Sequence, residues 1–394
     1  MSRSPRILII PSWYPPDGGY FFKEHSEAIH GMGWDVDVLV TRMVGARKLL
    51  KIGFSALRSR SGQDENGLRV SRTVFLKIPG SERLNIQRRV AHIVRAYNKY
   101  EKQFGKPDLI LAHSASWAGY AASLINEKHS IPYMVVEHRS YFVWQSAEAR
   151  KLVKPFYIPL FEKTYRNCRQ LVLVSESQLS GLKTLYPWIE EKVMVIPNMI
   201  REDMFMPPTK VRKTDPFVFF WAGRLEKVKG IDILLKAADI LRKKSSSNFT
   251  IRLAGRGSLG EELKQMAVEY GLADCVYFLG RLSREEMQDE MRNSNCFVLP
   301  TRYEAFGVVL IEAMASGLPL IATRSGGPDT IVKKENGLLV DTDNPGQLAE
   351  AMDWMLTNHV QFTPENIRAH VLKRFGQSNI MQQYNNLLIR LLEK

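Results

Sequence analysis

Short apolar runs alternate with longer segments in which apolar residues recur at helical spacing. The runs of strand length cover residues 6–11, 35–40, 109–112, 133–136, 171–174, 193–196, 217–221, 250–254, 276–279, 296–299 and 320–323. The helix-length segments cover residues 22–32, 118–127, 231–243, 259–270, 284–293 and 379–392. This alternation predicts an α/β fold in which helices cover both faces of parallel sheets.

The series of strand and helix units is longer than one sheet usually carries. At 394 residues the chain can form two domains, and prolines cluster with charged residues between 197 and 216, as in a linker. We therefore predict two Rossmann-like, doubly wound domains at 1–198 and 199–376, facing across a cleft. A C-terminal helix within 377–394 is expected to pack back on the first domain. Ligands of such sheets bind beyond the strand carboxyl ends, which places the active site in the cleft.

Two glutamates, Glu304 and Glu312, flank the start of a strongly apolar helix. A helix beginning near Gly307 would hold Glu312 a little over one turn inside it, among apolar residues where an unpaired charge is costly. The free N–H groups and dipole at the helix start suit a diphosphate. Glu304 would lie near a sugar attached to that diphosphate, and Glu312 near ribose hydroxyls. The alternative is an ordinary helix with two exposed glutamates, but the apolar context of Glu312 favours a sugar-nucleotide site without metal.

Another loop carries cations that could hold the same diphosphate. The strand at 217–221 leads into Gly223 and Arg224, and Lys229 follows before the next helix. Arg224 can bind phosphate as a fork and Lys229 as a compact charge, although a solvated loop is the alternative for this segment alone. In the first half, Gly18 and Gly19 would let the backbone approach a ligand closely, and a plain turn has the same pattern.

Motifs for other cofactors or for metals are weak. Residues 255–260 have the pattern G-x-G-x-x-G, but the next strand ends at Gly280-Arg281, without the acidic residue that holds ribose in nicotinamide sites. The D-x-D triplets at 35–37 and 341–343 are interpreted as structural, the first with outward-facing aspartates and the second as a helix cap. The eight histidines form no pair at ligand spacing, so we expect no metal and no cofactor.

Two histidines follow strands at the predicted cleft. His113 comes directly after residues 109–112, and His138 comes two positions after residues 133–136. A lone histidine is usually structural, but this shared position makes at least one of them a site candidate. His113 and Ser175 are candidates for the acceptor side of the site.

The amino-acid composition and the distribution of charge indicate the class of protein and its cellular location. Apolar residues at 45% and charged residues at 24% are typical of a soluble globular protein, and the apolar runs are too short to cross a bilayer. Residues 7–10 have the pattern of a strand rather than a signal peptide, and three cysteines without metal spacing favour a reduced cytoplasmic setting. Residues 1–200 contain 29 Lys or Arg and 17 Asp or Glu, whereas residues 201–394 contain 26 and 24. The first half therefore carries most of the net charge of +14.

Much of this charge falls on residues 42–60 and 83–95, where basic and aliphatic residues are interleaved. Both segments could form amphipathic helices that rest on an anionic membrane surface, with a solvated basic face as the equally weighted alternative. Nucleic-acid binding would need aromatic residues on the basic face, so no nucleic-acid partner is expected. We expect a cytoplasmic protein, peripheral on the inner face of the membrane.

Together these motifs resemble glycosyltransferase family 4, the retaining group 1 enzymes of GT-B architecture, over nearly the whole chain. The resemblance is carried by Gly223-Arg224-Leu225 with Lys229-Gly230, Gly255-Arg256-Gly257, Glu304–Glu312 and Gly326-Gly327-Pro328-Asp329. It implies that the first domain binds the acceptor and the second a UDP- or GDP-linked sugar. The implied catalytic residues are Arg224, Lys229, Glu304 and His138. The implied donor contacts are Gly18, Gly19, Gly223, Gly255, Gly280, Arg281, Phe306, Gly307, Val308, Val309 and Glu312.

The resemblance also implies a mechanism. The leaving diphosphate would stay on the face that the acceptor hydroxyl attacks and take its proton, so the anomeric configuration is retained without a protein nucleophile. The acceptor would be a glycan or a lipid-linked molecule of cell-surface polysaccharide or glycolipid biosynthesis. The chain departs from the family pattern at Trp34, Met199 and Asp329, which affects fine geometry. The alternatives are a non-catalytic, basic membrane-binding protein and a GT-B enzyme of other chemistry, such as a sugar-phosphate synthase or an epimerase.

Overall fold

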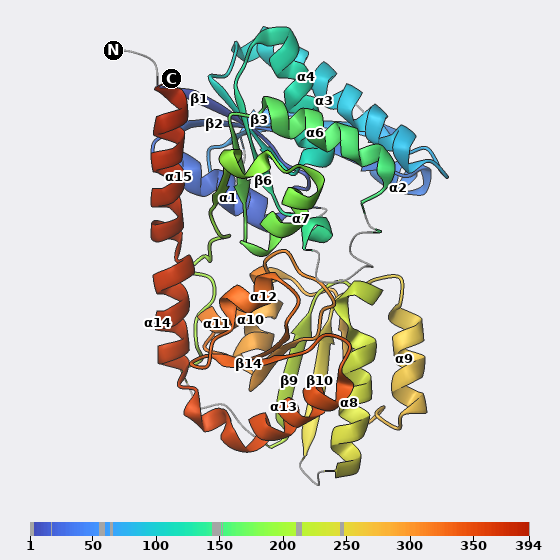
Figure 1. Ribbon diagram of the computed structural model, residues 1–394. Helices are drawn as coiled ribbons and strands as arrows, with labels where there is room; N and C mark the ends of the chain where they lie inside the picture. Colours follow the sequence, from blue (N-terminus) through green and yellow to red (C-terminus); the bar gives the residue numbers. More distant parts are fainter. Residues whose placement is uncertain are drawn as a thin grey trace.

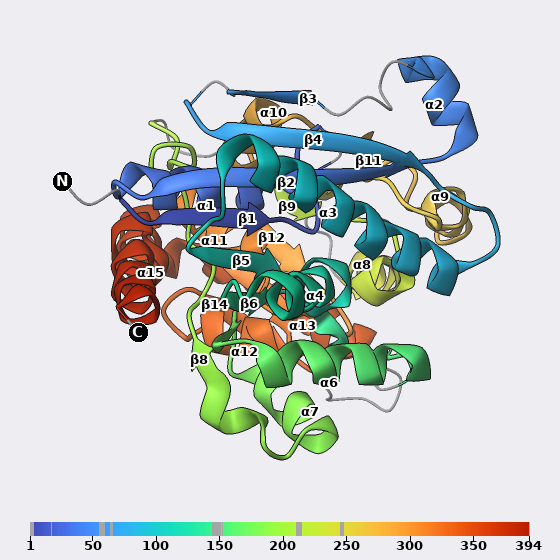
Figure 2. The same cartoon turned by 90° about the horizontal axis from the view of Figure 1, so that it is seen from above.

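The computed structural model contains two α/β domains, with the first above the second in Figure 1. It describes residues 4–16, 18–54, 60–63, 66–143, 151, 153–209, 215–244 and 248–393. Each domain is built on one sheet with helices on both sides (Figures 1 and 2). The predicted fold class, two doubly wound parallel-sheet domains, is confirmed.

The sheet of the first domain has the strand order β3-β4-β2-β1-β5-β6-β7-β8. All neighbours are parallel except β3, which pairs antiparallel with β4 at the edge. The strands are β1 Arg6–Ile10, β2 Asp35–Val44, β3 Arg60–Gln63, β4 Arg69–Leu76, β5 Leu109–His113, β6 Tyr133–Glu137, β7 Gln170–Leu173 and β8 Val193–Val195. The main helices are α1 Tyr20–Gly31, α2 Ala46–Ile52, α3 Glu82–Phe104, α4 Tyr120–His129, α6 Ile158–Asn167 and α7 Ser177–Leu185.

The sheet of the second domain has the order β11-β10-β9-β12-β13-β14, with every pair parallel. Its strands are β9 Phe217–Ala222, β10 Phe249–Ala254, β11 Val276–Gly280, β12 Cys296–Leu299, β13 Leu320–Thr323 and β14 Gly337–Val340. The helices are α8 Ile231–Lys244, α9 Gly260–Glu269, α10 Arg284–Arg292, α11 Val308–Ala315, α12 Gly327–Ile331, α13 Pro345–Asn358 and α14 Pro364–Phe375, and α15 Gln377–Leu392 follows the domain.

The central strands are buried along their whole length because helices cover both faces of each sheet. Every residue of β5, β6, β12 and β13 is buried. The expectation that both aspartates of residues 35–37 face outward is wrong for Asp37, which is 1% exposed. Its carboxylate accepts a hydrogen bond from the Tyr100 hydroxyl at 2.5 Å and pairs with Arg69 at 3.1 Å. Because α3 covers this face of β2, the alternating polar residue needs buried partners.

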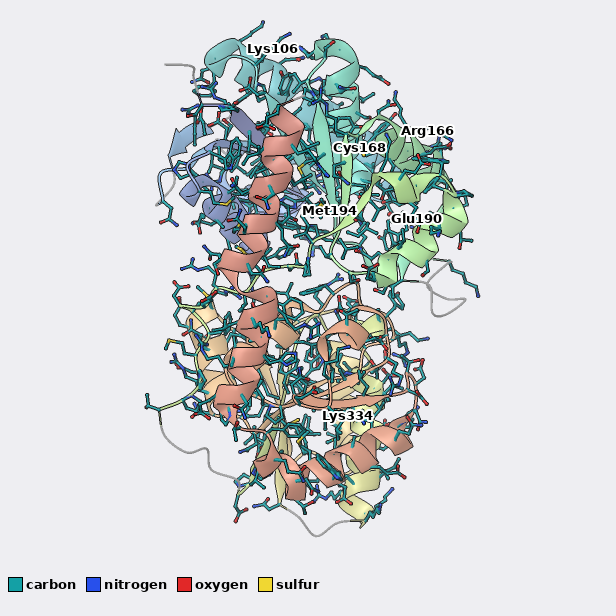
Figure 3. The ribbon with its side chains drawn as sticks, turned by 60° about the vertical axis from the view of Figure 1, so that its left-hand side comes forward. Lys106, Arg166, Cys168, Glu190, Met194 and Lys334 are labelled. Atoms are coloured by element: carbon teal, nitrogen blue, oxygen red, sulfur yellow. The ribbon has the colours of Figure 1, made fainter. Side chains whose placement is uncertain are left out.

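The chain crosses between the domains twice, near residue 200 and at Gly376, where Ile200 and Gly376 form a parallel bridge. Helix α14 packs against α11 of the second domain, and α15 packs against α1 of the first. Figure 3 shows the two red helices running along the side of both domains. Side chains fix α15 in place: the Trp34 indole N–H donates to Asn385 at 3.0 Å, and Arg390 donates to Gln170 at 2.9 Å.

The two basic segments differ from the predicted pair of surface helices. Strand β2 extends to Val44, so Arg42 lies on a strand, and α2 is limited to Ala46–Ile52; residues 55–59 lie outside the described part. In α3, Arg89 is only 9% exposed and faces the domain interior. Arg89 was assigned to the basic face of an amphipathic helix, and this assignment is wrong because the residue is buried. Among the described residues, no helix has both the length and the apolar character needed to cross a membrane.

Candidate active site

The glycines predicted to bind the donor follow the strands of the second domain, at the edge that meets the first domain. Gly223, Gly255 and Gly280 lie at the ends of β9, β10 and β11. The Gly223 N–H donates to Ala254 O at 2.9 Å, and the Gly255 N–H donates to Gly280 O at 2.7 Å. A side chain at Gly255 would meet the carbonyl oxygen of Gly223 at 1.7 Å. These loops can approach one another this closely only because they carry glycine.

Lys229 and Glu304 form an ion pair at this edge. The distance between Lys229 Nζ and Glu304 Oε2 is 2.5 Å, and the two side chains are 19% and 17% exposed. Lys229 ends a short helical turn, and Gly230 follows in the left-handed conformation. The backbone of Glu304 is fixed on both sides, since its N–H donates to Ser325 O and its carbonyl accepts from the Gly327 N–H. The structure therefore brings together the side chains predicted to contact the diphosphate and the sugar.

Helix α11 begins beside this ion pair. Gly307 precedes it with φ of 98°, and a side chain built on Gly307 would lie 3.6 Å from Glu304 Cγ. Within the described part of the chain no side chain caps this start, which leaves the first N–H groups, including those of Val308 and Val309, available to an anion. The α-carbon of Phe306 packs against Gly327, where a side chain would not fit. The predicted diphosphate segment is thus rigidly held next to a lysine.

Glu312 lies inside α11 and is buried, as its apolar neighbours indicated. Arg284, at the start of α10, donates to it at 2.5 Å and also to Glu24 of α1 at 2.5 Å. Burial raises the pKa of Glu312, and Arg284 opposes that shift. The sequence showed that Glu312 needed a partner but gave no signal that Arg284 was that partner. Because Glu24 belongs to the first domain, this arginine ties the predicted ribose-binding residue to the other domain.

The histidines predicted at the cleft contact each other. The His113 and His138 rings share a hydrogen bond of 2.9 Å between Nδ1 and Nε2. Sequence analysis missed His25, which is buried against His113 and against Tyr384 of α15, with ring centroids 5.3 and 4.4 Å away. Burial lowers the pKa of His25 to about 4 and, helped by His25 and Arg139, that of His138 to about 3. These two rings are therefore neutral at pH 7.

Glu137 fixes the turn that carries His138. Its carboxylate is fully buried and accepts hydrogen bonds from the N–H groups of Ala115, His138 and Arg139 and from the Tyr165 hydroxyl, each at 3.0 Å. Four donors satisfy the hydrogen-bonding capacity that burial would otherwise leave unmet. Glu137 thus positions the backbone of the predicted catalytic histidine.

The remaining candidates lie around this centre. The Ser175 hydroxyl donates to Ala305 O at 2.5 Å, so this residue joins the domains beside the donor loops. Gly19 packs directly on the carbonyl of Trp13, and Gly18 precedes it with φ of 105°. Arg224 is exposed on the loop after β9. Arg281, expected to border the base, lines a cavity formed mainly by the first domain.

Comparison with family models covers both domains. A model of group 1 glycosyl transferases matches residues 205–374, and a model of Glycosyltransferase Family 4 matches residues 19–203. The chain belongs to the group 1 glycosyltransferases of the GT-B architecture.

Individual relatives of the chain are distant in sequence. It is 28% identical over 239 residues to an uncharacterized glycosyltransferase of Methanocaldococcus jannaschii, covering 57% of this chain and 60% of that one. It is 28% identical over 271 residues to a D-inositol 3-phosphate glycosyltransferase of Corynebacterium jeikeium, covering 61% of this chain and 62% of that one. The match thus spans about 60% of the length of these curated relatives.

Solved structures show the same fold for the glycosyltransferase. Sucrose-phosphate synthase from Thermosynechococcus elongatus superposes with a TM-score of 0.81 at 23% identity, covering 99% of this chain and 100% of that chain. Anabaena HepE, solved in complex with UDP-glucose, superposes with a TM-score of 0.75 at 20% identity, covering 98% of this chain and 100% of that chain. At such identities the likeness shows the fold alone.

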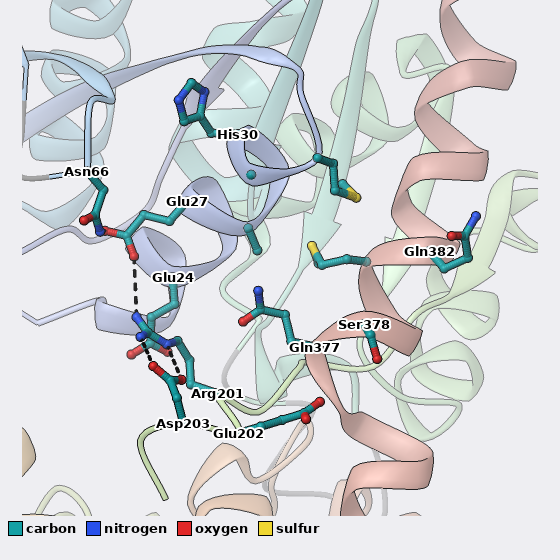
Figure 4. A pocket seen from close by; sticks show the side chains of 14 residues that line it. Glu24, Glu27, His30, Asn66, Arg201, Glu202, Asp203, Gln377, Ser378 and Gln382 are labelled. Atoms are coloured by element: carbon teal, nitrogen blue, oxygen red, sulfur yellow. Dashed lines mark hydrogen bonds and ion pairs between the residues drawn. The ribbon is translucent and has the colours of Figure 1, made fainter.

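A cavity of about 790 Å³ lies away from these loops. Figure 4 shows it between α1, residues 201–203 and the start of α15. Arg201 lies between Asp203, at 2.5 Å, and Glu27, at 3.8 Å. This cavity is lined by segments on either side of the chain crossings, and none of the predicted donor residues lines it.

Proposed function

We propose that this protein is a retaining glycosyltransferase that moves a sugar from a UDP- or GDP-sugar to a glycan or lipid-linked acceptor of the cell surface. The observation that carries the proposal is the Lys229–Glu304 ion pair beside the start of α11. The lysine and the helix start can bind the phosphates of a nucleotide-diphosphate sugar and balance their charge. The carboxylate can accept hydrogen bonds from the sugar hydroxyls.

In the proposed reaction the donor diphosphate binds at the start of α11 and draws Lys229 away from Glu304. Lys229, Arg224 and the helix dipole then stabilise the charge that grows on the leaving diphosphate. Glu304, released from the lysine, accepts hydrogen bonds from the sugar hydroxyls, and Glu312 does so from the ribose. The acceptor hydroxyl attacks the anomeric carbon from the face of the leaving group, whose oxygen takes the proton. This leaves the configuration retained.

A nucleotide panel tests the donor part of the proposal. Thermal shift of the full chain with UDP, GDP, ADP and CDP should show stabilisation by UDP or GDP, because a ligand that binds the folded state raises its stability by mass action. Incubation with UDP- and GDP-sugars and a lipid-linked acceptor should then release nucleotide. Absence of both stabilisation and nucleotide release across the panel would contradict the proposal.

A peripheral membrane location is part of the proposal, and residues 46–54, which comprise α2 and the two residues after it, support it. Leu50 and Phe54 are 69% and 67% exposed and adjoin Arg47, Lys48 and Lys51 on the same short segment. Exposed apolar side chains among basic ones favour insertion at an anionic lipid surface. Co-sedimentation of the full chain with phosphatidylglycerol vesicles should decrease in L50E and F54E variants and at high salt. Equal sedimentation of wild type and variants would contradict a membrane contact through α2.

A further inference from the structure

Arg284 lies where the two domains meet, at the start of α10. Its Nη1 donates to Glu312 Oε1 and its Nη2 donates to Glu24 Oε1, each at 2.5 Å. All three side chains are largely buried, with exposed fractions of 19% for Arg284, 11% for Glu312 and 12% for Glu24. One guanidinium group therefore serves two carboxylates, one from the second domain and one from α1 of the first.

The guanidinium group of Arg284 is fixed by more than its two carboxylates. Helix α10 begins with a capping box, in which Ser283 Oγ accepts from the Glu286 N–H at 3.1 Å and the Glu286 carboxylate accepts from the Ser283 N–H at 2.6 Å. The guanidinium carbon lies 5.0 Å from the ring centroid of Phe205, which is fully buried. A capped helix start, a buried ring and two ion pairs leave this group little freedom to turn.

The charge of Glu312 depends on this arginine. Burial raises the pKa of Glu312, the neighbouring Glu24 raises it further, and Arg284 is the group that lowers it. Burial alone would lower the pKa of Arg284, but the two carboxylates raise it above its usual value. Arg284 is therefore a cation, and it favours the carboxylate form of Glu312 inside an apolar helix.

The same ion pair restrains the orientation of Glu312. Oε1 already accepts from Arg284, so in the proposed function Oε2 receives the ribose hydroxyl. A carboxylate that is held through one oxygen presents the other in a fixed direction. Such a group rejects an analogue that lacks the hydroxyl, because its own hydrogen-bonding capacity is then left unmet.

The backbone connects Arg284 to the expected base site. Gly280 and Arg281, which are expected to border the base, lie four and three residues before it, and Gly280 turns the chain with φ of 73°. The loop that leaves β11 at the base site therefore ends at the residue that holds Glu312.

We propose that Arg284 is a positioning residue of the donor site, which acts through Glu312 and gives the site its preference for ribose over deoxyribose. The inference rests on the proposed function, in which Glu312 binds the ribose, and identifies a residue that determines the specificity of that site. In this role Arg284 acts on the carboxylate and not on the donor directly. If Arg284 only braced the two domains, its loss would weaken the binding of ribonucleotides and deoxyribonucleotides equally.

Nucleotide selectivity tests this role. The full chain is titrated by calorimetry with UDP, 2′-deoxy-UDP and 3′-deoxy-UDP, or with the guanosine analogues if GDP is the stronger ligand. The wild type should bind the ribonucleotide roughly 10- to 100-fold more tightly than at least one deoxy analogue, as expected for a hydrogen bond to a charged group. Arg284→Gln should reduce this ratio to below about threefold, because Glu312 is then neither held nor kept charged.

Two further variants control for structural damage. Arg252→Gln removes another ion pair of α10, in which Arg252 Nη2 donates to Glu290 at 2.8 Å, and it should leave the ratio unchanged. The double variant Arg284→Gln/Glu24→Gln removes the cation together with its second carboxylate. It keeps the formal charge of the cluster, so it remains testable if Arg284→Gln alone does not fold. The double variant should also lose the ratio.

A third comparison shows whether Arg284 acts through Glu312. Glu312→Gln should itself reduce the ratio, and adding Arg284→Gln should then change it by less than about twofold, as expected for residues that act as a unit. A further large decrease in the combined variant would show that Arg284 acts independently of Glu312 and would overturn the inference.

The titrations also separate this inference from the proposed function. A wild-type ratio that persists in Arg284→Gln, or in the double variant if the single one does not fold, contradicts the role of Arg284 alone. Equal binding of UDP and both deoxy analogues by the wild type does the same. A chain that binds none of the nucleotides contradicts the proposed function and, with it, this inference.

Discussion

The donor loops and the aromatic cluster around Trp117 in the first domain hold their cations in opposite ways. Lys229 and Arg284 each contact a carboxylate at 2.5 Å, whereas Arg89 and Arg139 pack on Trp117 and have no ion pair within the described part of the chain. An anion that enters the donor loops must displace a carboxylate that is already there. The first arrangement holds the cations by opposite charge, and the second holds them by ring stacking and, for Arg89, by the backbone carbonyls of Ser12 and Thr41.

The largest effect should come from removing a cation of the donor loops. Lys229→Ala and Arg224→Ala should each lower kcat by about 10²–10³-fold, as is typical when a group that stabilises developing charge is lost. Lys227→Ala is the matched control, because Lys227 is exposed two positions away in the same turn. Initial rates with a saturating donor measure the effect. Near-normal rates in both variants would contradict a role for Lys229 and Arg224 in catalysis.

A second prediction concerns acid stability, since the first domain also buries histidines without carboxylate partners. Burial lowers the pKa of His25 from 6.5 to about 4, so below pH 6.5 the unfolded chain binds a proton that the folded chain does not. Stability therefore falls as pH falls through the window from 6.5 to 4. At pH 5 the loss from His25 is about 2 kcal/mol. Urea unfolding at pH 7 and pH 5 measures it.

The variant His25→Phe keeps a neutral ring against Tyr384 and removes the titration. Its free energy of unfolding should depend less on pH than that of the wild type by about the same 2 kcal/mol between pH 7 and pH 5. An equal pH dependence in the two proteins would show that His25 is charged or solvated in the folded state.

The smallest expected effect is that of a chelator. Two cations and a helix start can balance a diphosphate without a metal, so the rate in excess EDTA should equal the rate without it. Loss of activity that manganese or magnesium restores would show that the donor loops need a metal to complete them.

The sequence predicted the layered architecture well because burial on both faces of a parallel sheet leaves uninterrupted apolar runs. It also located the segment Glu304–Glu312, since a glutamate within an apolar helix is conspicuous. Arg284 and Arg89 could not be found in this way. Both lie on polar helices where a charged residue is ordinary, and only the packing of distant segments makes one a bridge between domains and buries the other. Asp37 was placed wrongly for the same reason.

Helix α15 has a consequence for how the protein is made. It packs on α1 and contacts Trp34 and His25 of the first domain, but it follows the entire second domain in the chain. During synthesis the first domain emerges from the ribosome first, and its surface around His25 waits uncovered until Tyr384 and Asn385 have been added. The domain that begins folding earliest is thus completed last, and a nascent chain interrupted before Gln377 presents an unfinished face to chaperones and proteases.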